Sequence, residues 1–147
     1  MIPLVIPPKI VIDTNVFVSA LRSQYGASNK LFMLVDSGKF EINLSVPLAI
    51  EYEDAGKRLV GKRGDLKTSD IDDILDYVCS VAQRRKVYYL WRPFLADPKD
   101  DMILELAVSA GCDVIVTYNK HDFEGVDRFG IRTLTAQEFL REIGELP

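Results

Sequence analysis

Short runs rich in Ile, Val and Leu alternate along this chain with longer segments in which apolar residues recur at helical spacing. We expect strands at residues 9–13, 41–44, 87–90, 113–117 and 131–134. We expect helices at about 15–21, 28–37, 46–59, 69–85, 102–110 and 135–144. Strands separated by helices favour a parallel sheet joined by right-handed crossovers. The predicted fold is therefore a three-layer α/β/α sandwich, with helices on both faces of a five-stranded parallel sheet.

The bulk composition is that of a soluble globular domain. A length of 147 residues fits one domain, 1–147, with a substantial core. No apolar stretch approaches the roughly 20 residues that a membrane span needs. Residues 1–8 lack the basic region and cleavage site of a secretory signal, and Cys79 and Cys112 lie in apolar helical contexts. We therefore expect a cytoplasmic protein with buried, reduced thiols and no membrane association.

An acid stands at the end of the first predicted strand. Asp13 follows the apolar run 10–12 and precedes a helix, which places its carboxylate at the edge of the sheet where open α/β folds bind ligands. Glu51 lies on the helix after the second strand, Asp101 opens the helix before the fourth, and Asp122 follows the fourth. The first and fourth strands can be neighbours in such a sheet, which would bring Asp13 and Asp122 to the same edge.

Each of these acids also has an ordinary structural explanation. Asp13 and Asp101 can cap helices, Glu51 can belong to a solvated helix face, and Asp122 can be a turn residue. Independent capping does not require the four positions to converge, however. Convergent carboxylates repel one another, and a hard divalent cation with oxygen ligands relieves that repulsion. Taken together, the acids predict a metal site.

The sequence lacks other catalytic machinery. His121 is the only histidine, which excludes a ribonuclease that relies on two histidines. There is no Gly-rich phosphate loop, Gly-x-Ser-x-Gly motif or Cys-x-x-Cys motif. Phosphatases of the aspartyl type place a second Asp two residues after the nucleophile, whereas here that residue is Asn15, which cannot exchange a proton. This argues against phosphoryl-enzyme chemistry at Asp13 without deciding the matter.

Four segments, in order, resemble the PIN-domain family, and most closely the toxin group of PIN nucleases found in bacteria and archaea. They are IVIDTNVFVSAL at 10–21, LSVPLAIEYE at 44–53, DPKDDMILELA at 97–107 and DVIVTYNKHDF at 113–123. The resemblance covers essentially the whole chain. It implies a PIN-like version of the three-layer fold.

The resemblance also implies roles for individual residues. It makes Asp13 the first metal ligand, Glu51 the second acid and Asp101 the third. A small shift of a helix would exchange neighbouring acids; the alternatives are Glu53 or Asp54 for Glu51, and Asp100 for Asp101.

The fourth acid departs from the family pattern. Many relatives carry Asp at the position of Asn119, and Asp122 follows three residues later. Either Asp122 supplies the fourth charge or three carboxylates act with Asn119. Asn15 and Thr117 are expected to orient a ligand or a metal-bound water.

The activity that the resemblance implies is that of a Mg²⁺- or Mn²⁺-dependent endoribonuclease. Carboxylates would hold one or two ions, an ion would lower the pKa of a bound water, and the resulting hydroxide would attack phosphorus in line. Toxin relatives pair with a small antitoxin and often form homodimers, so both partners are expected. Two alternatives stay open: a non-catalytic PIN-like module that binds proteins, and a phosphatase that uses Asp13 as its nucleophile.

The net charge of −4 does not indicate nucleic-acid binding by the surface as a whole. A basic segment nevertheless continues the helix that carries Glu51, with Lys57, Arg58, Lys62 and Arg63. We expect these four side chains to contact RNA phosphates along the entrance to the site. The alternative is a solvated surface that binds nothing.

Overall fold

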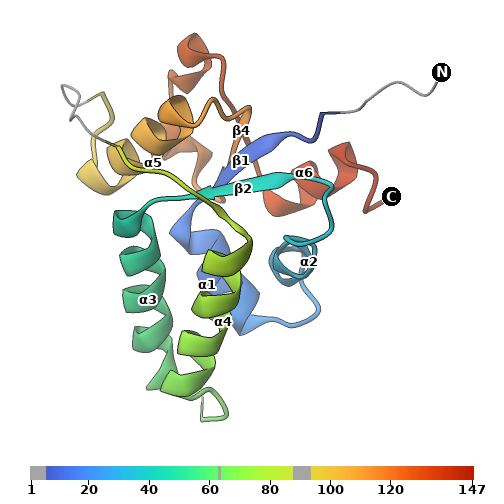
Figure 1. Ribbon diagram of the computed structural model, residues 1–147, viewed down its shortest axis with the longest axis vertical. Helices are drawn as coiled ribbons and strands as arrows, with labels where there is room; N and C mark the ends of the chain where they lie inside the picture. The colour runs from blue at the N-terminus through green and yellow to red at the C-terminus, as the bar shows by residue number, and fades with distance from the viewer. Residues whose placement is uncertain (1–5, 63, 88–93) are drawn as a thin grey trace.

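The computed structural model describes residues 6–62, 64–87 and 94–147 (Figure 1). Within these ranges the chain forms a five-stranded sheet in which every strand pair is parallel. The strands are β1 (Lys9–Ile12), β2 (Glu41–Leu44), β3 (Gln83–Arg84), β4 (Val114–Val116) and β5 (Arg132–Leu134). Their spatial order is β3-β2-β1-β4-β5, so β1 lies at the centre beside β4. The predicted α/β fold and the neighbouring first and fourth strands are confirmed.

Six α-helices cover the sheet in the described part of the chain. They are α1 (Thr14–Arg22), α2 (Ala27–Met33), α3 (Val46–Val60), α4 (Thr68–Val81), α5 (Pro98–Ser109) and α6 (Ala136–Glu142). Two short 3-10 helices, η1 (Lys120–Phe123) and η2 (Val126–Phe129), lie between β4 and β5. Figure 1 shows α5 on one side of the sheet and α1, α3 and α4 on the other, which is the expected three-layer arrangement.

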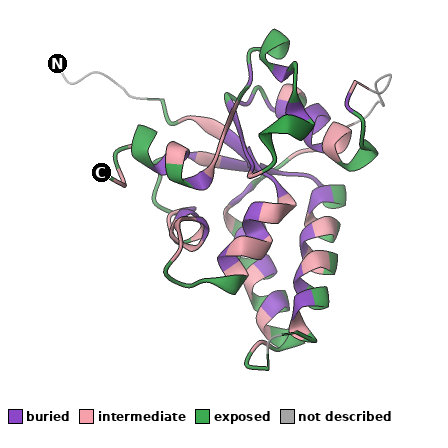
Figure 2. Ribbon diagram, turned by 180° about the vertical axis from the view of Figure 1, so that it is seen from behind, coloured by how far each residue is buried: buried purple, intermediate pink, exposed green. Residues whose placement is uncertain are grey.

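The core lies between these layers. The strands β1 and β4 are buried almost throughout, as expected for the central strands of a parallel sheet covered on both faces. Figure 2 shows the buried residues along the strands and on the inward sides of the helices. The rings of Phe17 and Tyr52 stack with centroids 4.7 Å apart and join α1 to α3. This packing fixes α3, which carries Glu51, against the helix that follows Asp13.

Local signals in the sequence account for several helix ends. The Ser45 hydroxyl accepts the Leu48 N–H at 3.3 Å and caps α3, as its position predicts. Thr135 and Glu138 form the expected capping box at the start of α6. Among the helices that the structure describes, none has both the length and the apolar character needed to cross a membrane. Both cysteines are free thiols, Cys112 buried and Cys79 partly so.

Several predicted boundaries are wrong. The helix expected at 28–37 ends at Met33. The helix expected at 69–85 ends at Val81, because residues 83 and 84 pair with β2 as strand β3 and Arg85 donates its backbone N–H to the Leu44 carbonyl at 2.8 Å. The strand expected at 87–90 is not formed at Val87, and its other residues lie outside the described ranges. The helix expected at 102–110 begins four residues earlier, at Pro98. The earlier start of α5 changes the candidate site.

Candidate active site

The register between β1 and β4 creates the centre of the site. Ile12 pairs with Val116, so the residues that follow them, Asp13 and Thr117, meet at the carboxyl end of the sheet. The Thr117 hydroxyl donates to Asp13 Oδ2 at 2.7 Å, and the Thr14 N–H donates to Asp13 Oδ1 at 2.8 Å. Asp13 therefore caps α1 and is held by β4 at the same time. This contact orients the Asp13 carboxylate, and the expected role of Thr117 towards a ligand or a metal-bound water stays a prediction.

Asp13 is buried, with 7% of its surface exposed. Burial raises its pKa above the usual range, while the hydrogen bonds from Thr117 and Thr14 act in the opposite direction and Asp122 raises it further. Tyr52 buttresses the same strand end from α3, because its hydroxyl donates to the Ile12 carbonyl. The pKa of Tyr52 is raised by burial and then by the nearby charge of Asp13.

A pocket of about 200 Å³ opens in front of Asp13. Its acids come from four separate parts of the fold: Asp13 after β1, Glu51 on α3, Asp97 and Asp100 at the start of α5, and Asp122 on η1. Asn15, Asn119 and Lys99 also line it. Sequence positions more than 100 residues apart are thus brought together, which is the convergence that independent capping does not require.

Asp100 is the acid most affected by the others. Its pKa rises to about 6, first because of burial and then because of Asp13, Asp122, Asp97 and Asp101, in that order. Burial contributes most to this shift, and the four neighbouring acids add to it.

Asp101, the predicted third acid, does not line this pocket. Its Oδ1 accepts the backbone N–H groups of Leu95 at 2.9 Å and Phe94 at 3.2 Å, which ties the preceding loop to α5. Because α5 begins at Pro98 with Asp97 as its N-cap, Asp100 turns towards Asp13 and Asp101 turns towards the loop. The third acid of the pocket is thus Asp100, the neighbour that the sequence offered as the alternative.

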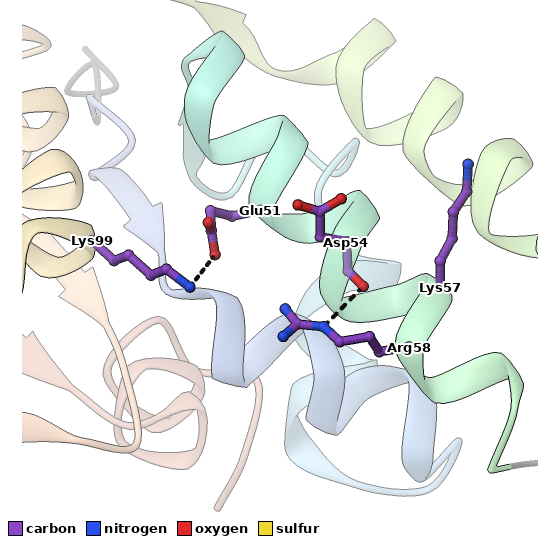
Figure 3. A pocket seen from close by; sticks show the side chains of 5 residues that line it. All are labelled: Glu51, Asp54, Lys57, Arg58 and Lys99. Carbon is purple, nitrogen blue, oxygen red and sulfur yellow. Dashed lines mark hydrogen bonds and ion pairs between the residues drawn. The ribbon is translucent and has the colours of Figure 1, made fainter.

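Glu51 lines the pocket, as predicted, and its neighbours do not replace it there. Lys99 Nζ lies 3.7 Å from Glu51 Oε2 (Figure 3). Glu53 instead pairs with Lys57 at 3.5 Å, and Asp54 lines an adjoining groove. Lys99 is a pocket residue that the sequence reasoning missed, although a single basic residue within the acidic run 97–101 was the available signal.

The segment after β4 contributes Asn119 and Asp122 to the pocket, and Asn15 of α1 contacts this segment. Asn15 Oδ1 accepts the Tyr118 N–H at 3.4 Å, and the Asn119 N–H donates to Thr117 Oγ1 at 3.0 Å. These contacts bend the chain around the end of β4, so that Asn119 and Asp122 both face the pocket. Asn119 and Asp122 therefore both contribute polar groups to the pocket.

Of the four predicted basic residues, two line a groove beside the acidic pocket. Arg58 and Lys57 line the groove next to the acidic pocket, but Lys57 pairs with Asp72 of α4 at 3.2 Å. Lys62 is exposed just beyond the end of α3, and Arg63 lies outside the described residues.

The residues of the pocket fit a hard divalent cation by their chemistry. Carboxylate and amide oxygens are the donors that Mg²⁺ and Mn²⁺ prefer. The pKa values of Asp13 and Asp100 are raised first by burial and then by neighbouring carboxylates, and a bound cation would favour the charged forms of both. In the described ranges, however, no three His, Cys, Asp or Glu side chains lie close enough together to hold an ion as they stand. The oxygen donors that an ion needs thus line the pocket, but in the described residues their spacing is too wide for three acids to contact one ion at the same time.

Comparison with known proteins identifies the family of this chain. A search among curated proteins found no significant match. A family model described as "PIN domain" matches residues 9–121, well over half of the 147 residues, and this range contains every acid that lines the pocket except Asp122, which follows it directly. The chain therefore belongs to the PIN-domain family, whose members are generally nucleases.

Proposed function

We propose that this protein is a metal-dependent endoribonuclease that hydrolyses RNA phosphodiester bonds with Mg²⁺ or Mn²⁺. The observation that supports it best is the pocket in front of Asp13, where acids from four separate elements converge. The family supports the same reading, because PIN nucleases generally use divalent metals.

The protein's own groups have distinct tasks in this proposal. Asp13 would be the central ligand, because Thr117 and Thr14 fix both of its oxygens. Glu51, Asp100 and Asp122 would complete the set from three sides of the pocket. An ion held there would supply an acidified water as nucleophile and would offset charge on the departing oxygen. Asn15 and Asn119 line the same pocket and would orient the water or the phosphate.

RNA would approach along the basic side of α3. Arg58 lines the groove beside the pocket and Lys62 is exposed beyond it, so these two are the contacts we favour from the predicted basic segment. Because the protein carries a net charge of −4, this local guidance is needed to bring a polyanion to an acidic site.

The experiment that tests the proposal is a cleavage assay on single-stranded and structured RNAs with Mn²⁺, with Mg²⁺ and with EDTA. Wild type should cleave with either ion and leave 5′-phosphate and 3′-hydroxyl ends. Asp13→Asn and Asp100→Asn should lower the rate by at least about 100-fold, whereas Asp101→Asn should retain most of it. Activity that survives EDTA would reject the metal mechanism.

The finer biological role that we propose is that of the toxin in a toxin–antitoxin pair, acting on RNA in the cytoplasm, neutralised by a small antitoxin and assembled as a homodimer. Exposed apolar side chains on α3, Val46 and Ile50, lie one helical turn apart and offer surface for a protein partner. Expression of wild type should arrest growth, and expression of Asp13→Asn should not. Sedimentation of the purified protein tests the homodimer.

A non-catalytic PIN-like module is the second candidate. The amide at Asn119 and the spacing of the carboxylates in the described ranges favour it. Mn²⁺ binding separates the two candidates, since the nuclease requires an ion that Asp13→Asn loses, while a protein-binding module does not.

A further inference from the structure

Two depressions adjoin on the same face of the molecule and share two residues. The acidic pocket in front of Asp13 and a wider groove along α3, of about 520 Å³, are both lined by Glu51 and Lys99. The groove is completed by Asp54, Lys57 and Arg58 (Figure 3). The Glu51–Lys99 ion pair thus stands at the boundary between a site suited to a cation and a groove that carries basic groups.

The positive charge of Lys99 is stabilised by nearby acids and not by the helix that carries it. It lies in the first turn of α5, where the helix dipole disfavours a cation. Asp97, Asp100 and Glu51 line the same pocket and offset that effect. The ion pair is long, at 3.7 Å, and the Lys99 side chain is 64% exposed, so the pair is weak and easily exchanged.

Arg58 faces Lys99 across the groove. Its Nε donates to the Asp54 carbonyl at 3.3 Å, and Figure 3 shows its guanidinium on the same side of α3 as Glu51. Lys57 points away in the same view and pairs with Asp72 of α4 at 3.2 Å. Of the three basic residues that line the groove, Lys57 is thus paired with α4, which leaves Arg58 from α3 and Lys99 from α5 to meet an anion there.

Resting on the proposed nuclease function, we propose that Lys99 is an exchangeable cation. It neutralises Glu51 while the acidic pocket holds no ion, and when an ion is bound it turns to an RNA phosphate that Arg58 holds in the groove. Metal binding and RNA binding are then coupled through one side chain. A metal ion displaces Lys99 from Glu51 and frees it for the phosphate, and a phosphate that binds Lys99 frees Glu51 for the ion. The groove takes a backbone phosphate adjacent to the one that is cleaved.

The first test measures Mn²⁺ affinity without RNA. Lys99→Met should bind Mn²⁺ roughly threefold to tenfold more tightly than wild type, the size expected for removing one charge near a divalent ion in a solvated site. Lys120→Met is the matched control, since it removes the same charge from an ion pair with Glu138, which does not line the pocket. Equal Mn²⁺ affinities for the two variants would overturn the proposal.

The second test measures binding of a short single-stranded RNA in EDTA at several salt concentrations, with Glu51→Gln as the background, because this change releases Lys99 without an ion. In this background Lys99→Met and Arg58→Met should each reduce the dependence of log affinity on log salt by about 0.7, the value for one phosphate contact. Lys57→Met should leave it unchanged, because Lys57 pairs with Asp72. Glu51→Gln should strengthen binding, and that gain should shrink in the Glu51→Gln/Lys99→Met double variant. A salt dependence for Lys99→Met equal to that of Lys57→Met would overturn the proposal.

The two levels of the proposal fail in different ways. If wild type binds no Mn²⁺ and cleaves no RNA, the nuclease function falls and the role of Lys99 falls with it. If wild type binds Mn²⁺ and cleaves RNA while Lys99→Met behaves like the control lysines, only the exchange is wrong.

Discussion

Asp13 shows that a structural role and a functional role can belong to one side chain. One of its oxygens caps α1 through the Thr14 N–H, and the other accepts the Thr117 hydroxyl. Capping, the ordinary explanation for an Asp at a helix start, is thus correct and does not compete with the metal-site interpretation. The same contacts that satisfy the helix hold a buried carboxylate in a fixed orientation at the front of the pocket.

Thr117 is the residue through which the state of Asp13 can be tested. Thr117→Val removes the hydroxyl that lowers the pKa of Asp13, so that pKa should rise further. Since a proton competes with Mn²⁺ for the carboxylate, the pH at which Mn²⁺ binding is half complete should move upward. Thr117→Ser keeps the hydroxyl and should behave like wild type. An unchanged pH profile in Thr117→Val, measured by Mn²⁺ titration, would show that the contact does not tune the site.

Asp100 and Asp101 are adjacent but should respond oppositely to removal of charge. The pKa of Asp100 is about 6 in the fold against an ordinary 3.8, so its stabilising contribution is full below 3.8 and is lost as pH rises through 6. Asp100→Asn should therefore raise the metal-free free energy of unfolding at pH 7.5 by about 1 kcal/mol or less, an amount discounted for its solvent exposure. The gain should fade at pH 4.5.

Asp101→Asn is the matched comparison. It replaces a charged acceptor of the Phe94 and Leu95 N–H groups by a weaker, neutral one, so unfolding free energy should fall by about 0.5–1 kcal/mol at pH 7.5. Urea unfolding of the two variants at both pH values checks the pair. Destabilisation by Asp100→Asn at pH 7.5 would contradict the repulsion that we assign to the pocket.

At the scale of elements, the start of α5 decided which acid reaches the pocket. The sequence Asp97-Pro98 is a helix start, with Asp as cap and Pro in the first position, where its missing N–H costs nothing. The two prolines before residue 100 predicted a loop, and this hid the signal. A start four residues too late made Asp101 the expected first residue of the helix, and the resemblance gave it the role of third acid, whereas Asp100 is the residue that lines the pocket.

The end of α4 could not be predicted from local preference. Gln83, Arg84 and Arg85 all favour helix, so the periodic pattern extends naturally to residue 85. Pairing with β2 decides otherwise: Arg84 pairs with Leu44, and Arg85 Nε donates to Asn43 Oδ1 at 3.0 Å. An edge strand of two residues depends on contacts with a strand some 40 positions away, which no window of sequence contains.

The close contact of α3 with α4 rests on Gly56. A Cβ built there would lie 3.0 Å from Ile71 Cγ2 and 3.5 Å from the Phe17 ring. Gly56→Val should therefore lower the free energy of unfolding by about 1–3 kcal/mol through overpacking. Because α3 carries Glu51, the same change should also weaken Mn²⁺ binding.

Gly61 is the control for this substitution. It ends α3 with an ordinary φ of −70° and has no atom within 4 Å of a built Cβ, so Gly61→Val should change stability by no more than about 0.5 kcal/mol. Thermal unfolding of both variants makes the comparison. Equal effects at the two glycines would mean that helix preference, and not packing against Ile71, sets the result.

For the whole molecule, the alternation of strands and helices was enough to predict the parallel sheet, and it allowed the pairing of β1 with β4 that the structure shows at the centre. That pairing alone places Asp13, at the end of β1, beside the end of β4, and Thr117, Asn119 and Asp122 come after β4. The position of Lys99 beside Glu51 was not predictable, because it depends on how α5 packs across the sheet from α3. Side-chain partners set by the packing of two helices are a property of the assembled fold.

Stabilisation by a bound ion is the prediction that belongs to the molecule as a whole. The acids of the pocket come from four separate elements, so an ion that joins them links segments that are distant in sequence and has no comparable site in the unfolded chain. At a Mn²⁺ concentration 100 times its dissociation constant, the gain is about 2.7 kcal/mol. For a chain of this length that corresponds to a rise of about 5–10 °C in Tm. Asp13→Asn should abolish the rise. Asp113→Asn should keep it, because Asp113 lies at the opposite end of β4, where it accepts the Lys9 N–H at 3.0 Å. A Tm that Mn²⁺ leaves unchanged in wild type, or raises equally in Asp13→Asn, would show that the acids in front of Asp13 do not act as one cation site.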